Sequence, residues 1–287
     1  MKLDESQSFF LQKFKDHTEN FDVDFLILTG SAGTGKTELI KKCVDYLKIN
    51  NFGHQCLAFT GRAASVLRSR GLENAKTIDS WLYRLNNKDT YEKELNPYDN
   101  FIFFIDESSM ISNSAIIFDE KEPELDFKLD EIMWSTFRHI NCKNILFIFV
   151  GDKNQLPPLK HDYCPALNEE YLTNRYGLSG KSYSLKTMHR QTSESNIPKL
   201  AENFISFDNE ISRAIPSIEK IEKDVQIIEN SEVVDIFFDL YFENKHDVKI
   251  ITATNKKADY YNFLIKEKLS TGKSKFFTPY QIPKDNL

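Results

Sequence analysis

The sequence is poor in glycine, with ten residues in 287, about half of the share that ordinary proteins carry. It also lacks any apolar run near the ~18 residues that a membrane-spanning helix needs. The first ten residues contain no long apolar stretch, so we expect no secretory signal. The four cysteines form no CxxC pair and no regular spacing, which argues against a zinc site or a disulfide framework. These absences predict a cytoplasmic protein that does not enter a membrane.

The net charge is also of the wrong sign for a protein that attracts nucleic acid with its whole surface. Lys and Arg total 37 and Asp and Glu total 43, a net charge of −6. Any nucleic-acid partner must therefore be held by a local basic track. Segment 61–84 has five basic residues against two acidic ones, a local charge of +3, whereas 118–131 has two against seven, a local charge of −5. Both segments are equally compatible with ordinary solvated faces.

Dense apolar runs of strand length alternate with helical patterns in the first two thirds of the chain. Such runs are typical of strands that are buried on both faces of a parallel sheet. The predicted strands are 25–28, 55–60, 101–106 and 144–152. A second alternation, with strands at 224–229 and 248–254 and helices at 231–243 and 255–269, follows residue 195. We therefore expect an α/β fold with helices on both faces of its sheet, divided into domains 1–194 and 195–287.

Three of the ten glycines lie within six positions and form a phosphate-binding loop. Residues 30–37 read GSAGTGKT, which satisfies G-x-x-x-x-G-K-[ST] between a strand and a helix. Backbone N–H groups and the helix N-terminus would cradle phosphates, with Lys36 adding positive charge and the Thr37 hydroxyl reaching Mg²⁺. The predicted nucleotide-binding residues are Gly30, Ser31, Ala32, Gly33, Thr34, Gly35, Lys36 and Thr37.

Two further motifs separate a hydrolase from a kinase. Asp106 and Glu107 follow a buried strand, where ligands of open α/β sheets bind. Asp106 is expected to hold Mg²⁺ and Glu107 to polarise the attacking water. Gln155 follows the strand at 144–152 in a turn stiffened by Pro157, where its amide can contact both the γ-phosphate and the water. An ordinary strand-to-loop turn is an equally good interpretation of this last motif taken alone.

These motifs occur in the order found in superfamily-one DNA helicases, and the sequence resembles the RecD/Dda branch, which moves 5′ to 3′. The resemblance covers about residues 3–265. It implies a P-loop NTPase with a RecA-like sheet and a partial second RecA-like domain. The segments that carry it are LDESQ (3–7), GSAGTGKT (30–37), AFTGRAA (58–64), TIDSW (77–81), IDESSM (105–110), GDKNQLPP (151–158) and MHRQ (188–191).

The resemblance also implies roles for residues that the pattern alone does not single out. Gln7 would recognise the adenine edge, and Arg190 would reach the γ-phosphate as an arginine finger. Five residues match segments that contact the backbone of single-stranded DNA without sequence preference. They are Thr60, Arg62, Thr252, Thr254 and Asn255. Trp81 and Phe59 could stack on bases, but core packing is the favoured interpretation for both.

The sequence departs from the family in four places. Asp79 occupies a position where the family has histidine. Residues 83–99 are a short insertion where relatives carry a strand-separating β-hairpin, and the acidic insertion 111–131 has no counterpart. Two late motifs of the second domain are missing from the 287 residues. We therefore expect a fragment or a truncated relative, with weak or absent unwinding.

The expected function is an ATP-dependent DNA helicase core, a Mg²⁺-dependent ATPase stimulated by single-stranded DNA. A monomer is expected, and subunits of DNA repair or replication are open as further partners. The alternatives are a P-loop ATPase that acts as a switch or remodels protein, and a binding module that uses ATP only structurally. Stimulation of ATP hydrolysis by single-stranded DNA distinguishes the helicase from the switch. Replacement of Glu107 by Gln distinguishes the binding module, whose turnover would stay near zero, from an active enzyme.

Overall fold

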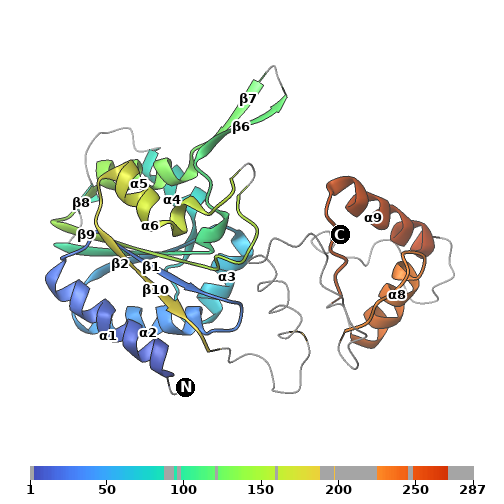
Figure 1. Cartoon of the computed structure of the whole chain (residues 1–287), viewed down its shortest axis with the longest axis horizontal. Coiled ribbons are helices and arrows are strands. Elements are labelled where there is room, and N and C mark those ends of the chain that lie inside the picture. Colours follow the sequence, from blue (N-terminus) through green and yellow to red (C-terminus); the bar gives the residue numbers. More distant parts are fainter. Residues whose placement is uncertain are drawn as a thin grey trace, which may run out of the picture. The chain divides into compact units, whose positions relative to one another are not determined.

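The structure is a computed structural model, and it describes residues 3–86, 94–95, 98–119, 122–158, 161–187, 197, 225–244 and 248–270. The chain divides into two compact units, Met1–Glu194 and Ser195–Leu287. Figure 1 traces both units along the sequence. Each is described by itself below.

A six-stranded, all-parallel sheet forms the centre of the first unit, as the sequence predicts. The strand order is β10-β1-β9-β5-β2-β3. All six residues of β1 are buried, as expected for a strand covered on both faces. The strands are β1 (Phe25–Gly30), β2 (Gly53–Ala58), β3 (Lys76–Thr77), β5 (Asn100–Asp106), β9 (Asn144–Gly151) and β10 (Gly180–Leu185).

Helices cover both faces of this sheet (Figure 1). One face carries α1 (Glu5–Asn20), α2 (Lys36–Ile49) and α3 (Gly61–Ser69), and the other carries α4 (Ile78–Asn86), α5 (Lys128–His139) and α6 (Glu169–Tyr176). Phe104 belongs to the core on the first face and Phe103 to the core on the second, because successive side chains of a strand point to opposite faces. The protein is therefore an α/β P-loop fold with a buried parallel sheet.

The predicted acidic insertion contains a β-hairpin. Strands β6 (Ser114–Asp119) and β7 (Glu122–Asp126) pair antiparallel and project from the first unit (Figure 1). In the predicted insertion 83–99, residues 83–86 continue α4, and β4 (Glu94–Leu95) pairs with β8 (Ile140–Asn141). The hairpin among the described residues thus lies after β5, and not before it.

The second unit contains the two helices that the sequence predicts, α8 (Val233–Asn244) and α9 (Asn255–Ser270). The two strands predicted beside them are wrong for the part of this unit that the structure describes, where 225–229 and 248–254 form no strand. A strand requires a neighbouring backbone to exchange hydrogen bonds, and the described residues provide none for these segments. The assignment of this unit as a partial RecA-like domain stays a prediction.

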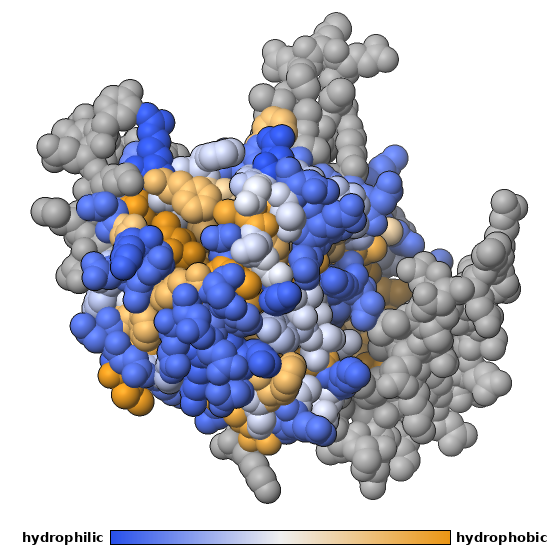
Figure 2. All heavy atoms as spheres, turned by 60° about the vertical axis from the view of Figure 1, so that its left-hand side comes forward, coloured by the Kyte–Doolittle hydropathy of each residue, from blue (hydrophilic) through white to orange (hydrophobic). Residues whose placement is uncertain are grey.

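The side of the molecule that faces left in Figure 1 shows patches of hydrophobic surface between hydrophilic side chains (Figure 2). Near the start of β9, a hollow of about 300 Å³ is lined partly by Phe21, Phe137, Ile140 and Ile145. Patches of this kind are common on soluble domains. Of the helices that the structure describes, none combines the length and the apolar character needed to span a bilayer.

Candidate nucleotide-hydrolysis site

The phosphate loop joins the end of β1 to the start of α2. Gly33 and Gly35 have φ angles of 86° and 80°, a left-handed conformation that glycine adopts without strain. Lys36 bends back over the loop, and its Nζ donates to the carbonyls of Gly30 at 2.5 Å and Ser31 at 3.1 Å. The loop thus holds the ammonium group beside the N-terminus of α2, where both favour an anion.

The acidic pair lies at the carboxyl end of β5, and β9 separates this strand from β1. Asp106 is only 8% exposed. Burial and, secondarily, the adjacent Glu107 raise the pKa of Asp106 to about 6, while the charge of Lys36 opposes the shift. Glu107 has a φ of 56°, a conformation that costs a residue other than glycine about 1–3 kcal/mol. Such strain is typical of functional sites. The surrounding structure imposes it on Glu107 at the turn between β5 and the short helix η1 (Ser108–Met110).

Gln155 lies in a turn that is fixed by Asp152 after the end of β9. The carboxylate of Asp152 accepts from the backbone N–H of Asn154 at 2.9 Å. The backbone carbonyl of Asp152 accepts from the backbone N–H of Gln155 at 3.2 Å. The side chain of Gln155 accepts a hydrogen bond from Ser109 Oγ at 2.7 Å. Sequence analysis missed Ser109, because a serine beside an acidic pair has no distinctive pattern of its own.

These elements meet at one pocket of about 650 Å³, a size typical of small-ligand sites. Helix α3 supplies part of its wall, including the predicted nucleic-acid residues Thr60 and Arg62. Thr60 Oγ1 also accepts from the N–H of Ala63 at 3.1 Å and so caps α3. The lining residues are Ala32, Gly33, Gly35, Lys36, Thr37, Glu38, Thr60, Arg62, Ala63, Val66, Arg70, Asp106, Glu107, Met110 and Gln155.

The pocket also has the donors that a magnesium ion prefers. The Thr37 hydroxyl and the Asp106 carboxylate line the same space, and both are hard oxygen ligands. A buried carboxylate with a raised pKa gains most from a nearby cation, because the cation offsets the cost of its charge. The residues present therefore fit the Mg²⁺ that P-loop NTPases use.

Gln7 lies beneath the phosphate loop and is not among the residues that line the pocket. Its side chain is fully buried. Nε2 donates to the carbonyl of Thr34 at 3.0 Å, and Oε1 accepts from the N–H of Asp4 at 3.2 Å. The amide is thus engaged once at each end, with one N–H and one lone pair left over. Its predicted recognition of adenine requires this fully buried side chain to become exposed to the pocket.

The remaining predicted site residues lie in the second unit or outside the described residues. Thr252 Oγ1 donates to the carbonyl of Thr254 at 3.0 Å, and that carbonyl accepts from Lys257 at the start of α9. Asn255 is the first residue of this helix and is exposed. Arg190 lies outside the described residues. Trp81 is 3% exposed and packs against Phe103, which agrees with the core interpretation.

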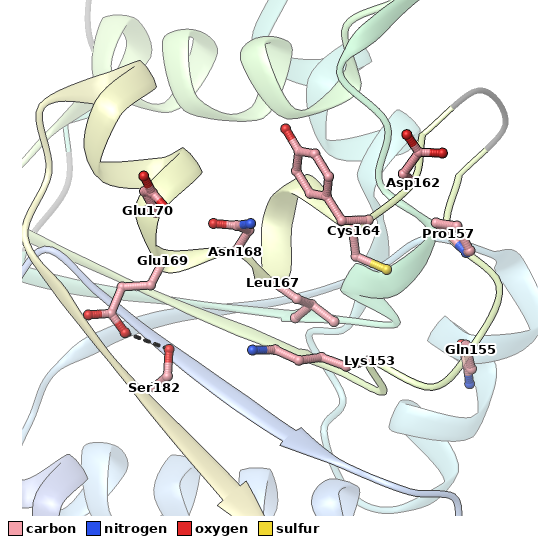
Figure 3. Close-up of a pocket in the computed structure, with 11 residues that line it drawn as sticks. Lys153, Gln155, Pro157, Asp162, Cys164, Leu167, Asn168, Glu169, Glu170 and Ser182 are labelled. Carbon is pink, nitrogen blue, oxygen red and sulfur yellow. Dashed lines mark hydrogen bonds between the residues drawn. The ribbon is translucent and has the colours of Figure 1, made fainter. Parts of the chain in front are cut away.

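A second cavity, of about 500 Å³, also borders the turn that carries Gln155 (Figure 3). Its lining includes Lys153, Cys164 and the pair formed by Glu169 and Ser182, in which the Ser182 hydroxyl donates at 2.7 Å. Gln155 lies at the rim of this cavity, away from that pair (Figure 3). Gln155 therefore lines both cavities.

The fold and the phosphate loop identify the protein as a P-loop NTPase. A family model described as an AAA domain matches residues 17–161, half of the chain. The chain therefore belongs to this AAA-domain family, AAA_19. The matched residues include the phosphate loop, Asp106, Glu107 and Gln155.

Several individual proteins resemble this chain in sequence or in structure. An uncharacterised protein of Methanocaldococcus jannaschii is 29% identical over an alignment of 265 residues, which covers 83% of this chain and 21% of that protein. The Pif1 helicase of Candida albicans matches with a TM-score of 0.50 and 20% identity, over 94% of this chain and 55% of the helicase. Pif1 of Bacteroides sp in complex with ADP-AlF4 gives a TM-score of 0.44 and 18% identity, over 91% and 56%. The chain thus spans about a fifth of the archaeal relative and about half of each helicase.

Proposed function

We propose that the chain is the ATP-hydrolysing core of a single-stranded-DNA helicase similar to the RecD/Dda branch. One observation carries this proposal. Thr60 and Arg62, the predicted DNA contacts, line the same pocket as Lys36, Asp106 and Glu107. A movement of α3 on DNA binding would therefore alter the hydrolysis site directly, and nucleotide binding would alter the grip on DNA.

In this proposal the nucleotide is ATP. The phosphate loop and Lys36 bind its phosphates, while Thr37 and Asp106 hold Mg²⁺, which supplies Lewis-acid polarisation when it is bound. Glu107 orients the attacking water and accepts its proton. Gln155 donates to the γ-phosphate and so distinguishes ATP from ADP. Arg190 acts as the arginine finger, a group that is worth about 10³–10⁵ in rate in related chemistry.

Side chains of both units would bind the sugar-phosphate backbone of the DNA. Arg62 is exposed on the first turn of α3 and would pair with a DNA phosphate. Thr252, Thr254 and Asn255, at the start of α9, would contact a second stretch of the strand. The second unit would then be the partial RecA-like domain that closes on ATP, in a cytoplasmic monomer that moves 5′ to 3′.

The test is ATP hydrolysis measured with and without a poly-dT oligonucleotide. We expect stimulation that falls steeply as salt rises, because backbone binding releases counterions. Arg62→Ala should raise the DNA concentration needed for half-maximal stimulation by about tenfold, in line with the loss of one charged contact. Arg138→Ala, an arginine in the last turn of α5, is the matched control and should behave as wild type. ATPase activity that is unaffected by DNA at low salt would contradict the proposal.

The same pocket also suits a P-loop ATPase that acts as a switch or remodels a protein without binding DNA. The net charge of −6 favours this second candidate, because such a surface does not attract a polyanion. In that case the basal rate would be unchanged by any oligonucleotide, and Arg62→Ala would have no effect that depends on DNA. The experiment above separates the two candidates.

A further inference from the structure

One hydrogen bond joins the acidic motif to the turn that carries Gln155. Ser109 Oγ donates to Gln155 Oε1 at 2.7 Å. Ser109 comes from η1, which follows β5, whereas Gln155 follows β9. Ser109 is fully buried, and Gln155 lines the nucleotide pocket. The bond therefore runs from the interior of the protein to the wall of the site.

In the observed bond the Ser109 hydroxyl is the donor and the amide is the acceptor. A glutamine side chain has an acceptor end, Oε1, and a donor end, Nε2. Ser109 binds the acceptor end, which leaves the two N–H groups of Nε2 for a partner in the pocket. Phosphate oxygens only accept hydrogen bonds, so a nucleotide phosphate needs this donor end. With the amide reversed, Oε1 would face the phosphate and repel it.

Both partners of the bond are held by rigid backbone. A Cβ atom on Gly151 would lie 3.0 Å from the backbone nitrogen of Ser109 and 2.8 Å from Leu167 Cδ1. A Cβ atom here would force η1 to shift away from the end of β9, so glycine favours this close approach. On the other side, Asp152 fixes the turn through the backbone N–H of Gln155. The separation of Ser109 and Gln155 is thus set by the sheet.

The same bond links Gln155 to the segment that carries Glu107. Ser109 lies two residues after Glu107, and the hydroxyl of the intervening Ser108 donates to the carbonyl of Ile105 at 2.7 Å. Residues 107–109 are therefore expected to move together. A displacement of Gln155 toward a phosphate therefore pulls on the turn that positions Glu107.

We infer that Ser109 is a positioning residue that orients the amide of Gln155 toward the γ-phosphate and couples it to Glu107. The inference rests on the proposed role of Gln155 as the group that detects the γ-phosphate. Ser109 itself contacts no nucleotide. Its contribution is to hold the amide at the pocket wall in the observed orientation, with Nε2 left for the nucleotide, and so to strengthen the preference for ATP over ADP.

The test measures the dissociation constants of ADP and of a non-hydrolysable ATP analogue by calorimetry, with Mg²⁺ and without DNA. In Ser109→Ala we expect the ADP value to stay within about twofold of wild type and the analogue to bind about tenfold more weakly, as for the loss of one oriented hydrogen bond to a charged group. The kcat should fall by a similar factor. Gln155→Ala should show the same pattern, and the double variant should be no worse than Gln155→Ala alone.

Two further variants separate orientation from folding. Ser109→Thr keeps the hydroxyl and should retain the wild-type preference for the analogue over ADP. Ser108→Ala removes a neighbouring buried hydroxyl that does not contact Gln155 and should also retain that preference. An unchanged preference in Ser109→Ala, or additive losses in the double variant, would overturn the inference. Because DNA is absent from this assay, failure of the helicase proposal appears separately, as a lack of stimulation by DNA.

Discussion

The side-chain amide of Gln7 donates to the carbonyl of Thr34 across 3.0 Å and so ties the first helix to the phosphate loop. The other end of the amide accepts from the N–H of Asp4, within the capping box of α1. Gln7 is fully buried, and buried polar groups that lose a partner are costly. In the structure, Gln7 therefore supports the loop from below.

Replacing Gln7 should weaken nucleotide binding as a whole. In Gln7→Ala the loop loses a partner, so we expect ATP and ADP to bind more weakly by the same factor, with about 1–3 kcal/mol lower stability. Gln12→Ala is the matched control, because Gln12 makes an exposed hydrogen bond to Asp16 in the same helix. Calorimetric titration with both nucleotides checks this. A selective loss of adenine over guanine nucleotides would instead support direct recognition of adenine.

Replacing Glu107 should separate binding from turnover. Glu107→Gln keeps the size and the backbone of the residue but cannot accept a proton from water. We expect kcat to fall by at least about 10²-fold, within the range for a lost general base, with little change in the dissociation constant of ATP. Single-turnover hydrolysis together with equilibrium binding measures both quantities. Turnover equal to that of wild type would exclude Glu107 as the base.

Replacing Asp106 should stabilise the protein that has neither nucleotide nor metal. Its pKa is raised to about 6 by burial and by Glu107, so the folded state binds the proton more tightly than the unfolded state. The ionised carboxylate therefore costs stability above pH 6, and this cost disappears as the pH falls to about 4. Asp106→Asn should raise the free energy of unfolding at pH 8 by at most about 3 kcal/mol.

Thermal unfolding at pH 8 and pH 4 measures the effect of this substitution. At pH 8 the melting temperature should rise by about 2–4 °C for each kcal/mol, and at pH 4 the variant and the wild type should match. The same variant should lose ATP hydrolysis, because it lacks the charge that holds Mg²⁺. If the variant and the wild type were equally stable at both pH values, burial of the Asp106 carboxylate would not destabilise the protein.

Two glycines outside the phosphate loop provide a matched pair. A Cβ atom on Gly61 would meet no atom within 4 Å, whereas one on Gly151 would crowd Leu167 and Ser109. Within the protein, packing therefore favours glycine at position 151 but not at position 61. Gly61→Ala should be neutral or stabilising by up to about 1 kcal/mol, while Gly151→Ala should destabilise the protein and impair hydrolysis. Urea unfolding of both variants measures the difference.

The sequence alone predicts the elements whose burial is strongest. Strands β1, β5 and β9 are dense apolar runs, and the phosphate loop has a fixed pattern. Strand β10 was missed because it has only one fully buried residue, Leu185. The bond from Ser109 to Gln155 could not be predicted, because it depends on the packing of η1 against Gly151 and not on any local pattern.

The central claim is that nucleotide state and DNA grip are coupled through one pocket, and equilibrium binding of DNA tests it most directly. The dissociation constant of a fluorescent poly-dT oligonucleotide is measured with Glu107→Gln in three states: without nucleotide, with ADP and with ATP. We predict that the ATP and ADP values differ at least about fivefold, the lower end of typical coupling between sites. Equal affinity for the oligonucleotide in all three states would contradict the account.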